Sequence, residues 1–144
     1  MSVFKPDNLT DAKYENKEYL MNAYDNTIRY TDGFLASLIT LLQKMNSFSA
    51  MLYTSDHGED IFDDNRKLFL HASPVPSYYQ LHVPFLIWLS KTYREKNVEV
   101  HEAILQNREK PVAGNASVFH TMLNLAGIQT PYRADSLLSL IHIS

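Results

Sequence analysis

The stretch SAMLYTSDHGEDIFDDNRKLFLHASP, residues 49–74, passes abruptly from an apolar run into charged and histidine side chains. Residues 49–54 are short, apolar and aromatic, which is typical of a buried strand. The candidate site residues after this run are Asp56, His57, Gly58, Glu59 and His71. Residues 56–80 predict a long loop, and loops longer than about 15 residues in a compact domain are usually functional. The stretch therefore predicts a buried strand that ends in a candidate site.

Apolar spacing predicts a long helix before this strand and a second strand after the loop. From residue 18 to residue 45 apolar side chains recur at helical spacing, although Gly33 predicts a break or a close contact. A second apolar run, residues 83–89, predicts another buried strand. Residues 91–114 are charged and predict irregular structure.

A second helix is predicted over residues 115–126, with Gly127 where a C-terminal cap belongs. Its expected core face comprises Val118, Phe119, Met122, Leu123 and Ala126. The order of helix, strand, site loop, strand and helix predicts an α/β fold with a mostly parallel sheet flanked by helices.

Composition excludes several classes of protein. The chain has 144 residues, of which 45% are hydrophobic and 20% charged, as is ordinary for a globular protein. The 13 basic and 16 acidic residues give a net charge of −3, so no electrostatic case for nucleic-acid binding arises. Because cysteine is absent, disulfides, thiolate metal sites and cysteine nucleophiles are excluded. No signal peptide is visible, and no apolar run approaches the ~20 residues of a membrane helix.

The residues after the first predicted strand are suited to metal chemistry. Asp56 and His57 stand where open α/β sheets commonly bind ligands, and carboxylate and imidazole groups are good zinc ligands. Gly58 permits the tight turn by which adjacent side chains converge on one ion. Glu59 is expected to orient the imidazole or a loop amide from behind the ligands. His71 is expected to contact a substrate oxyanion or a second metal ion.

The same loop also supports a less specific interpretation, because an Asp-His-Gly tripeptide in a turn is often only a solvated loop. Asp60, Asp63 and Asp64 lack the spacing of an EF-hand and predict a solvated loop. Thr54 and Ser55 lack the glycine elbow of a serine-type nucleophile and are expected to be strand-end residues.

Five segments together resemble one family of enzymes. They are NAYDNTIRYTDGFL (22–35), MLYTSDHGEDIF (51–62), LFLHASP (68–74), HVPFLIWLS (82–90) and SVFHTMLNLAGI (117–128). In this order they resemble the catalytic domain of bacterial phosphoethanolamine transferases, which are membrane-anchored enzymes of the alkaline phosphatase and sulfatase superfamily. Ser-Asp-His-Gly-Glu alone is shared with sulfatases, while Leu-His-x-x-Pro and VPFLIWLS narrow the match to the transferases.

The resemblance implies that Asp56 and His57 are zinc ligands and that His71 contacts the transferred phosphate or a second zinc ion. It also implies that a threonine attacks phosphatidylethanolamine and that phosphoethanolamine passes from phosphothreonine to lipid A or a related envelope glycan. The parent protein is then expected in the bacterial inner membrane, with its catalytic domain in the periplasm.

The resemblance further implies that the chain is part of a domain. The family's nucleophilic threonine, a glutamate ligand, another active-site histidine and the membrane helices have no counterpart in this sequence. Residues 1–137 are therefore expected to be the C-terminal half of a sulfatase-like catalytic domain with a partial alkaline-phosphatase-like fold, inactive alone. Residues 138–144, LSLIHIS, match the translation of a common transposase sequencing adaptor and are expected to be an artefact.

Two other functions remain open for the parent protein. One is a sulfatase or phosphodiesterase of the same superfamily, which would hydrolyse its substrate rather than transfer a group. The other is a non-catalytic metal-binding or interaction domain that retains the fold.

Overall fold

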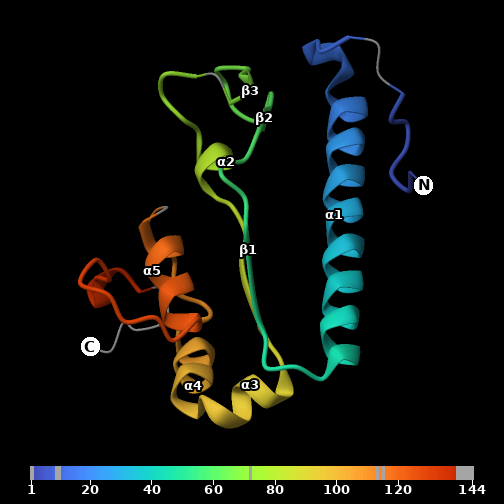
Figure 1. Ribbon diagram of the computed structural model, residues 1–144. Coiled ribbons are helices and arrows are strands. Elements are labelled where there is room, and N and C mark those ends of the chain that lie inside the picture. The colour runs from blue at the N-terminus through green and yellow to red at the C-terminus, as the bar shows by residue number, and fades with distance from the viewer. Residues whose placement is uncertain (1, 9–10, 72, 113, 115, 139–144) are drawn as a thin grey trace. The chain divides into compact units, whose positions relative to one another are not determined.

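The computed structural model describes residues 2–8, 11–71, 73–112, 114 and 116–138. The chain forms two compact units (Figure 1). The first comprises Met1–Leu41 and Ser55–Pro84, and the second comprises Leu42–Thr54 and Phe85–Ser144. Within the described ranges, no helix is both long and apolar enough to cross a lipid bilayer. Of the residues expected to come from a sequencing adaptor, 139–144 lie outside the described part of the chain.

The long helix α1, Lys17–Met45, follows the 3-10 turn η1 at Tyr14–Asn16. It confirms the predicted long helix, but the expected break or close contact at Gly33 is wrong because the helix runs through this residue without interruption. A methyl group on Gly33 would meet no atom within 4 Å, so this position faces open space. No described residue of α1 is fully buried, and large apolar side chains such as Ile28 and Phe34 are exposed.

The predicted loop of residues 56–80 contains regular structure. Strand β2 is Asp60–Ile61, strand β3 is Phe69–Leu70, and helix α2 is Tyr78–Leu81. The two strands form an antiparallel ribbon in which Asp60 pairs with Leu70 and Ile61 with Phe69. The hydroxyl of Ser77 caps α2 by accepting a hydrogen bond from a backbone N–H of the helix at 3.2 Å. A strand of two residues is too short to show an alternation of apolar and polar side chains, so the sequence pattern could not predict these strands.

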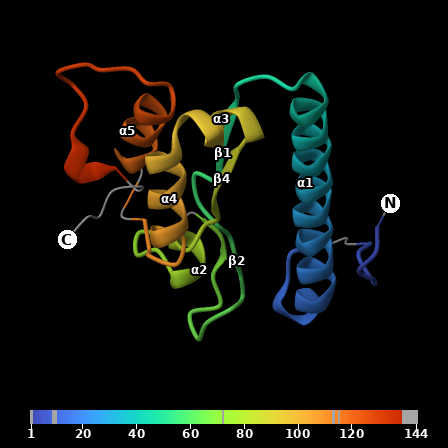
Figure 2. The ribbon, with the colours of Figure 1, turned by 90° about the horizontal axis from the view of Figure 1, so that it is seen from below.

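The second unit contains a two-stranded sheet of β1, Ala50–Thr54, and β4, Phe85–Leu89. Both predicted strands are confirmed, as is the mixed helix-and-strand fold class. The prediction of a mostly parallel sheet is wrong for the described residues, because the strands run antiparallel with Leu52 opposite Ile87. Parallel neighbours need a crossover, usually through a helix of several turns. In its described residues, the connection from β1 to β4 contains only the ribbon and one helical turn, and the chain returns along β1 in the opposite direction (Figures 1 and 2).

Two helices lie within residues 91–114, where the prediction of irregular structure is wrong: α3, Lys91–Lys96, and α4, Val98–Asn107. The hydroxyl of Ser90 caps α3 by accepting a hydrogen bond from the N–H of Tyr93 at 3.1 Å. Leu89, Tyr93 and Leu125 form a buried hydrophobic cluster, and the partly buried residues packed against it are Ala50, Leu52, Ile87, Val100 and Ile104. The many charged residues of this segment mask the four-residue apolar spacing that turns one face of α4 to the core.

Helix α5, Ala116–Leu125, confirms the second predicted helix, but part of its predicted core face is wrong. Phe119, Met122 and Ala126 are exposed, and the buried residues of α5 are Ser117, His120, Thr121 and Leu125. Contacts from neighbouring segments explain which face is covered. The hydroxyl of Tyr93 donates to the carbonyl of Leu125 at 2.8 Å, and the N–H of Ala134 donates to Nδ1 of His120 at 3.1 Å.

The end of α5 confirms the predicted glycine cap. Gly127 has a φ of +67°, which L-residues with a side chain rarely adopt. The N–H of Gly127 donates to the carbonyl of Asn124, and that of Ile128 donates to the carbonyl of Leu123, both at 2.9 Å. This pair of hydrogen bonds is a Schellman motif. A 3-10 turn, η2, follows at Asp135–Leu137.

Candidate metal centre

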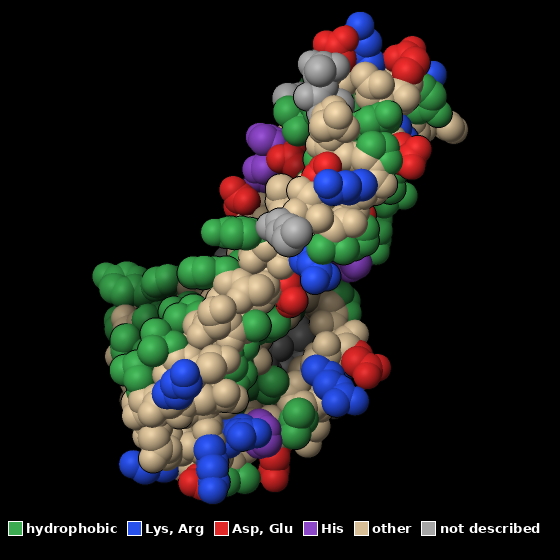
Figure 3. Space-filling view, turned by 90° about the vertical axis from the view of Figure 1, so that its right-hand side faces the viewer, with side chains coloured by type: hydrophobic (Ala, Val, Ile, Leu, Met, Phe, Trp, Pro, Cys, Tyr) green, Lys and Arg blue, Asp and Glu red, His purple; other side chains and the backbone are tan. Residues whose placement is uncertain are grey.

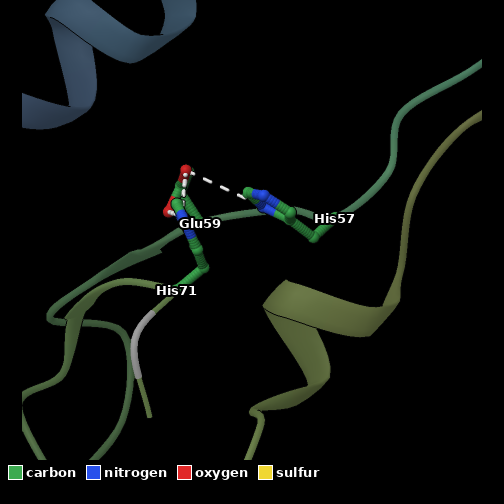
Figure 4. Close-up of side chains that lie close together, drawn as sticks. All are labelled: His57, Glu59 and His71. Atoms are coloured by element: carbon green, nitrogen blue, oxygen red, sulfur yellow. Dashed lines mark hydrogen bonds and ion pairs between the residues drawn. The ribbon is translucent and has the colours of Figure 1, made fainter.

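Three side chains of the first unit converge: His57, Glu59 and His71 (Figure 4). One ligand atom of each lies within 4.8 Å of the other two. Nδ1 of His71 lies 2.9 Å from Oε1 and 3.0 Å from Oε2 of Glu59. Nδ1 of His57 lies 3.8 Å from Oε1 of the same carboxylate, and the two imidazole centroids are 3.9 Å apart. The structure thus brings the two predicted histidines together around the glutamate.

The small ribbon explains why residues separated in sequence meet. Glu59 directly precedes β2 and His71 directly follows β3, so the antiparallel pairing of Asp60 with Leu70 sets them beside each other. Leu70 has a left-handed φ of +63°, which turns the chain at the end of the ribbon. His57 lies on the segment that enters the ribbon, two residues before Glu59.

The cluster is open to solvent on one side. The side chain of Glu59 is 22% exposed, whereas those of His57 and His71 are 37% and 50% exposed. Figure 3 shows histidine and acidic side chains lying next to one another at the molecular surface. A ligand in solution can therefore reach the three donor groups.

Asp56 approaches Nε2 of the His57 ring, whereas Glu59 approaches Nδ1. Its Oδ1 accepts a hydrogen bond from the backbone N–H of His57 at 3.0 Å, and its Oδ2 is 3.6 Å from Nε2 of the ring. The hydrogen bond from the His57 N–H lowers the pKa of Asp56 below its ordinary value, which keeps this carboxylate charged. Asp56 and His57 are thus close enough to share an ion, and the role of Asp56 as a ligand stays a prediction.

The donor set of the cluster fits zinc. Two imidazole nitrogens and one carboxylate are the ligands of many catalytic zinc sites, in which a fourth position is left for water or substrate. Donor atoms about 2.0–2.1 Å from a tetrahedral ion lie about 3.4 Å from one another. The separations of 2.9 Å and 3.8 Å found here lie on either side of that value. Glu59, which was expected only to support the ligands, is therefore a candidate ligand itself.

The other acidic residues of the loop differ from one another. Asp63 forms an ion pair with Lys17 at 3.4 Å, and Asp64 forms one with Arg66 at 2.5 Å. The hydrogen bond from the Arg66 side chain lowers the pKa of Asp64. Asp60 is fully buried, so the prediction of a solvated acidic loop is wrong at this position. Its partners are Ser77 and Gln80, which no spacing or motif in the sequence would have singled out.

The chain that carries this cluster matches one protein family over most of its length. The model of the sulfatase family matches residues 3–128, and the chain belongs to this family. Among its curated relatives are phosphoethanolamine transferases EptA of Salmonella typhimurium, 38% identical over 130 residues, and of Helicobacter pylori, 33% identical over 126 residues. Each alignment covers 85% of the chain but only 23% and 22% of the respective relative, so the chain spans less than a quarter of their length.

Solved structures of similar fold come from the same group of proteins. The C-terminal periplasmic domain of EptC from Escherichia coli superposes with a TM-score of 0.78 at 24% identity, covering 96% of this chain and 38% of that domain chain. The corresponding EptC domain from Campylobacter jejuni gives a TM-score of 0.73 at 27% identity, covering 96% and 44%. The resemblance to phosphoethanolamine transferases and the alkaline-phosphatase-like fold are thereby confirmed.

Proposed function

We propose that the parent protein is a zinc-dependent phosphoethanolamine transferase that moves phosphoethanolamine from phosphatidylethanolamine to lipid A or a related envelope glycan. The convergence of His57, Glu59 and His71 in a chain of this family carries the proposal. The names of the curated relatives support it, among them a Kdo(2)-lipid A phosphoethanolamine transferase of Escherichia coli. Further support comes from the Escherichia coli EptC domain, which has also been solved in complex with Zn.

In this proposal His57, Glu59 and His71 hold the metal ion, and Asp56, which lies beside the His57 ring, completes its surroundings. Zinc would neutralise phosphoryl oxygens and lower the pKa of an attacking hydroxyl. His71 is the most exposed of the three side chains, so a phosphate that arrives from solvent meets this side of the metal centre first.

The reaction proposed for the parent protein has two displacement steps. A threonine hydroxyl, expected in a part of the parent protein outside this chain, attacks the phosphorus of phosphatidylethanolamine, and diacylglycerol leaves with the proton. A hydroxyl of lipid A or a glycan then attacks the phosphothreonine, which restores the threonine. The periplasmic origin of the solved EptC domains supports a parent in the bacterial inner membrane with this chain on the periplasmic side.

Mass spectrometry of lipid A tests this function. Bacteria without such an enzyme that express the parent protein should gain phosphoethanolamine on lipid A, and His57→Ala in the parent should abolish the gain. His101→Ala on α4 is the matched control, because His101 lies outside the cluster. The purified 144-residue chain should transfer nothing, because the nucleophilic threonine of the family is expected to lie outside it.

Each other outcome separates the rival functions. Release of free phosphoethanolamine or sulfate without modified lipid A would indicate a hydrolase. Zinc binding with neither product would indicate a non-catalytic metal-binding domain. Full transfer by the His57→Ala parent would show that the cluster is not the active centre.

A further inference from the structure

A buried carboxylate lies directly beside the candidate metal centre. Asp60 follows Glu59 in the chain and is 0% exposed. In the described part of the chain no lysine or arginine forms an ion pair with it, and its oxygens accept hydrogen bonds from two polar side chains instead. Oδ1 accepts from the hydroxyl of Ser77 at 2.5 Å, and Oδ2 accepts from the amide nitrogen of Gln80. A buried carboxylate is costly without such partners, so these bonds must persist in the folded chain.

Gln80 connects this carboxylate to every part of the candidate metal centre. Its backbone carbonyl accepts a hydrogen bond from the N–H of Gly58, which stands between His57 and Glu59, at 2.9 Å. Its side-chain amide donates to Asp60 and also, at 3.4 Å, to the carbonyl of Leu70, the residue before His71. The chain neighbour of each candidate ligand is therefore bonded to this one residue.

The close approach of α2 to the site segment is built into the sequence. A methyl group on Gly58 would lie 2.1 Å from the backbone carbonyl oxygen of Tyr79, so only glycine admits this contact. The hydroxyl of Ser77 caps α2 and also donates to Asp60, which joins the start of the helix to the ribbon. The ribbon itself has only two residues in each strand. Strands that short are weakly held by their own pairing, so α2 is a principal support of the segment.

We propose that Asp60 and Gln80 are positioning residues, which hold His57, Glu59 and His71 in one arrangement by fastening both ends of the ribbon to α2. The proposal rests on the proposed function in so far as that arrangement binds a metal ion. Neither residue is a candidate ligand: Asp60 is turned into the protein, and Gln80 is 5% exposed.

Two readouts on the 144-residue chain test the proposal. The first is the NMR cross-relaxation between the His57 and His71 rings, measured without metal. The second is the affinity for Zn²⁺, measured by titration calorimetry. Gln80→Glu sets a second carboxylate against Asp60, and we expect it to remove the cross-relaxation and to weaken Zn²⁺ binding roughly tenfold to a hundredfold, as the loss of groups behind metal ligands does. Gln43→Glu is the matched control on an exposed position of α1 and should change neither readout.

The exchanged pair Asp60→Asn with Gln80→Glu separates positioning from simple loss of structure. In this variant the donor and acceptor trade places, so we expect cross-relaxation and Zn²⁺ affinity to return to within about threefold of the original values, short of full recovery because the bond to Leu70 is lost. If Gln80→Glu keeps both readouts, the proposal is overturned. If circular dichroism shows that Gln80→Glu is unfolded, recovery of the cross-relaxation and of the Zn²⁺ affinity in the exchanged pair supports the proposal. An exchanged pair that is folded but recovers neither readout overturns it.

The same measurements distinguish this proposal from the proposed function. An unsubstituted chain that binds no Zn²⁺ contradicts the metal centre, while the metal-free cross-relaxation still shows whether Asp60 and Gln80 position the rings. If the unsubstituted chain binds Zn²⁺ and Gln80→Glu has the same affinity and the same ring contact, the metal centre is supported and the role of Gln80 is contradicted.

Discussion

At the residue scale, the three candidate ligands are expected to act as one site. Replacing any one of His57, Glu59 and His71 by alanine should lower the affinity of the chain for Zn²⁺ by roughly tenfold or more, because the set of three donors then loses one. Titration calorimetry with His101→Ala as the control measures this affinity. If all three variants bind Zn²⁺ with the affinity of the unsubstituted chain, the metal binds elsewhere.

Tyr93 gives a prediction that concerns stability rather than the site. Its hydroxyl donates to the carbonyl of Leu125 at 2.8 Å, and burial raises the pKa of the phenol. The phenol therefore ionises later in the folded chain than in the unfolded chain. Its contribution is complete below the unfolded pKa of about 10 and is lost as the pH rises through the folded pKa.

Tyr93→Phe should lower the free energy of unfolding by about 1 kcal/mol at neutral pH, because the buried carbonyl loses its donor. It should also flatten the loss of stability above about pH 10. Denaturant unfolding across alkaline pH measures both effects, with Tyr132→Phe as the control, since Tyr132 is 80% exposed. If Tyr93→Phe leaves the fall in the free energy of unfolding above about pH 10 unchanged, other groups cause that fall.

The histidines and carboxylates of the site were visible in the sequence because their chemistry is distinctive and a strand precedes them. Gln80 and Ser77 were not visible, because an amide and a hydroxyl in a polar loop resemble solvated residues until a buried carboxylate is found against them. Glu59 was assigned a supporting role because sequence distance hides the pairing that carries it to His71.

At the scale of elements, the glycines of two helices predict opposite effects. Gly127 ends α5 with a φ of +67°, so Gly127→Ala should lower the free energy of unfolding by roughly 1–2 kcal/mol. Gly33 lies inside α1 with no atom within 4 Å of an added methyl group, so Gly33→Ala should raise it by roughly 0.5–1 kcal/mol. Denaturant unfolding of both variants measures the difference. If both substitutions change the free energy of unfolding in the same direction, backbone conformation does not control stability at these positions.

Helices with clear apolar spacing were predictable, whereas α3 and α4 were not. In those two helices charged residues outnumber the few apolar positions that reach the core, so the spacing is hard to separate from a charged loop. On α5 the spacing identified the helix but misplaced its face. Tyr93 and Ala134 bond to Leu125 and His120, and these contacts from distant segments decide which side is covered.

At the scale of the whole molecule, the family resemblance predicted the class of fold better than the order of elements predicted the sheet. Alternating helices and strands favour parallel pairing only when a helix crosses between the strands. Here the segment between β1 and β4 is given over to the site loop, so the two strands pair in opposite directions. The length of this loop, in which no long helix crosses between the described strands, accounts for a strand direction that the order of elements did not reveal.

The short span of the site has a consequence for how the chain folds. All groups that form and fasten the cluster come from residues 57–80, whereas the sheet must pair Thr54 with Phe85 across that whole segment. The entropy lost on closing a loop grows with the logarithm of its length, and contacts between residues close in sequence form fastest. The cluster therefore belongs to the rapidly closing part of the chain, and its closure shortens the effective distance that β1 and β4 must cover to find each other.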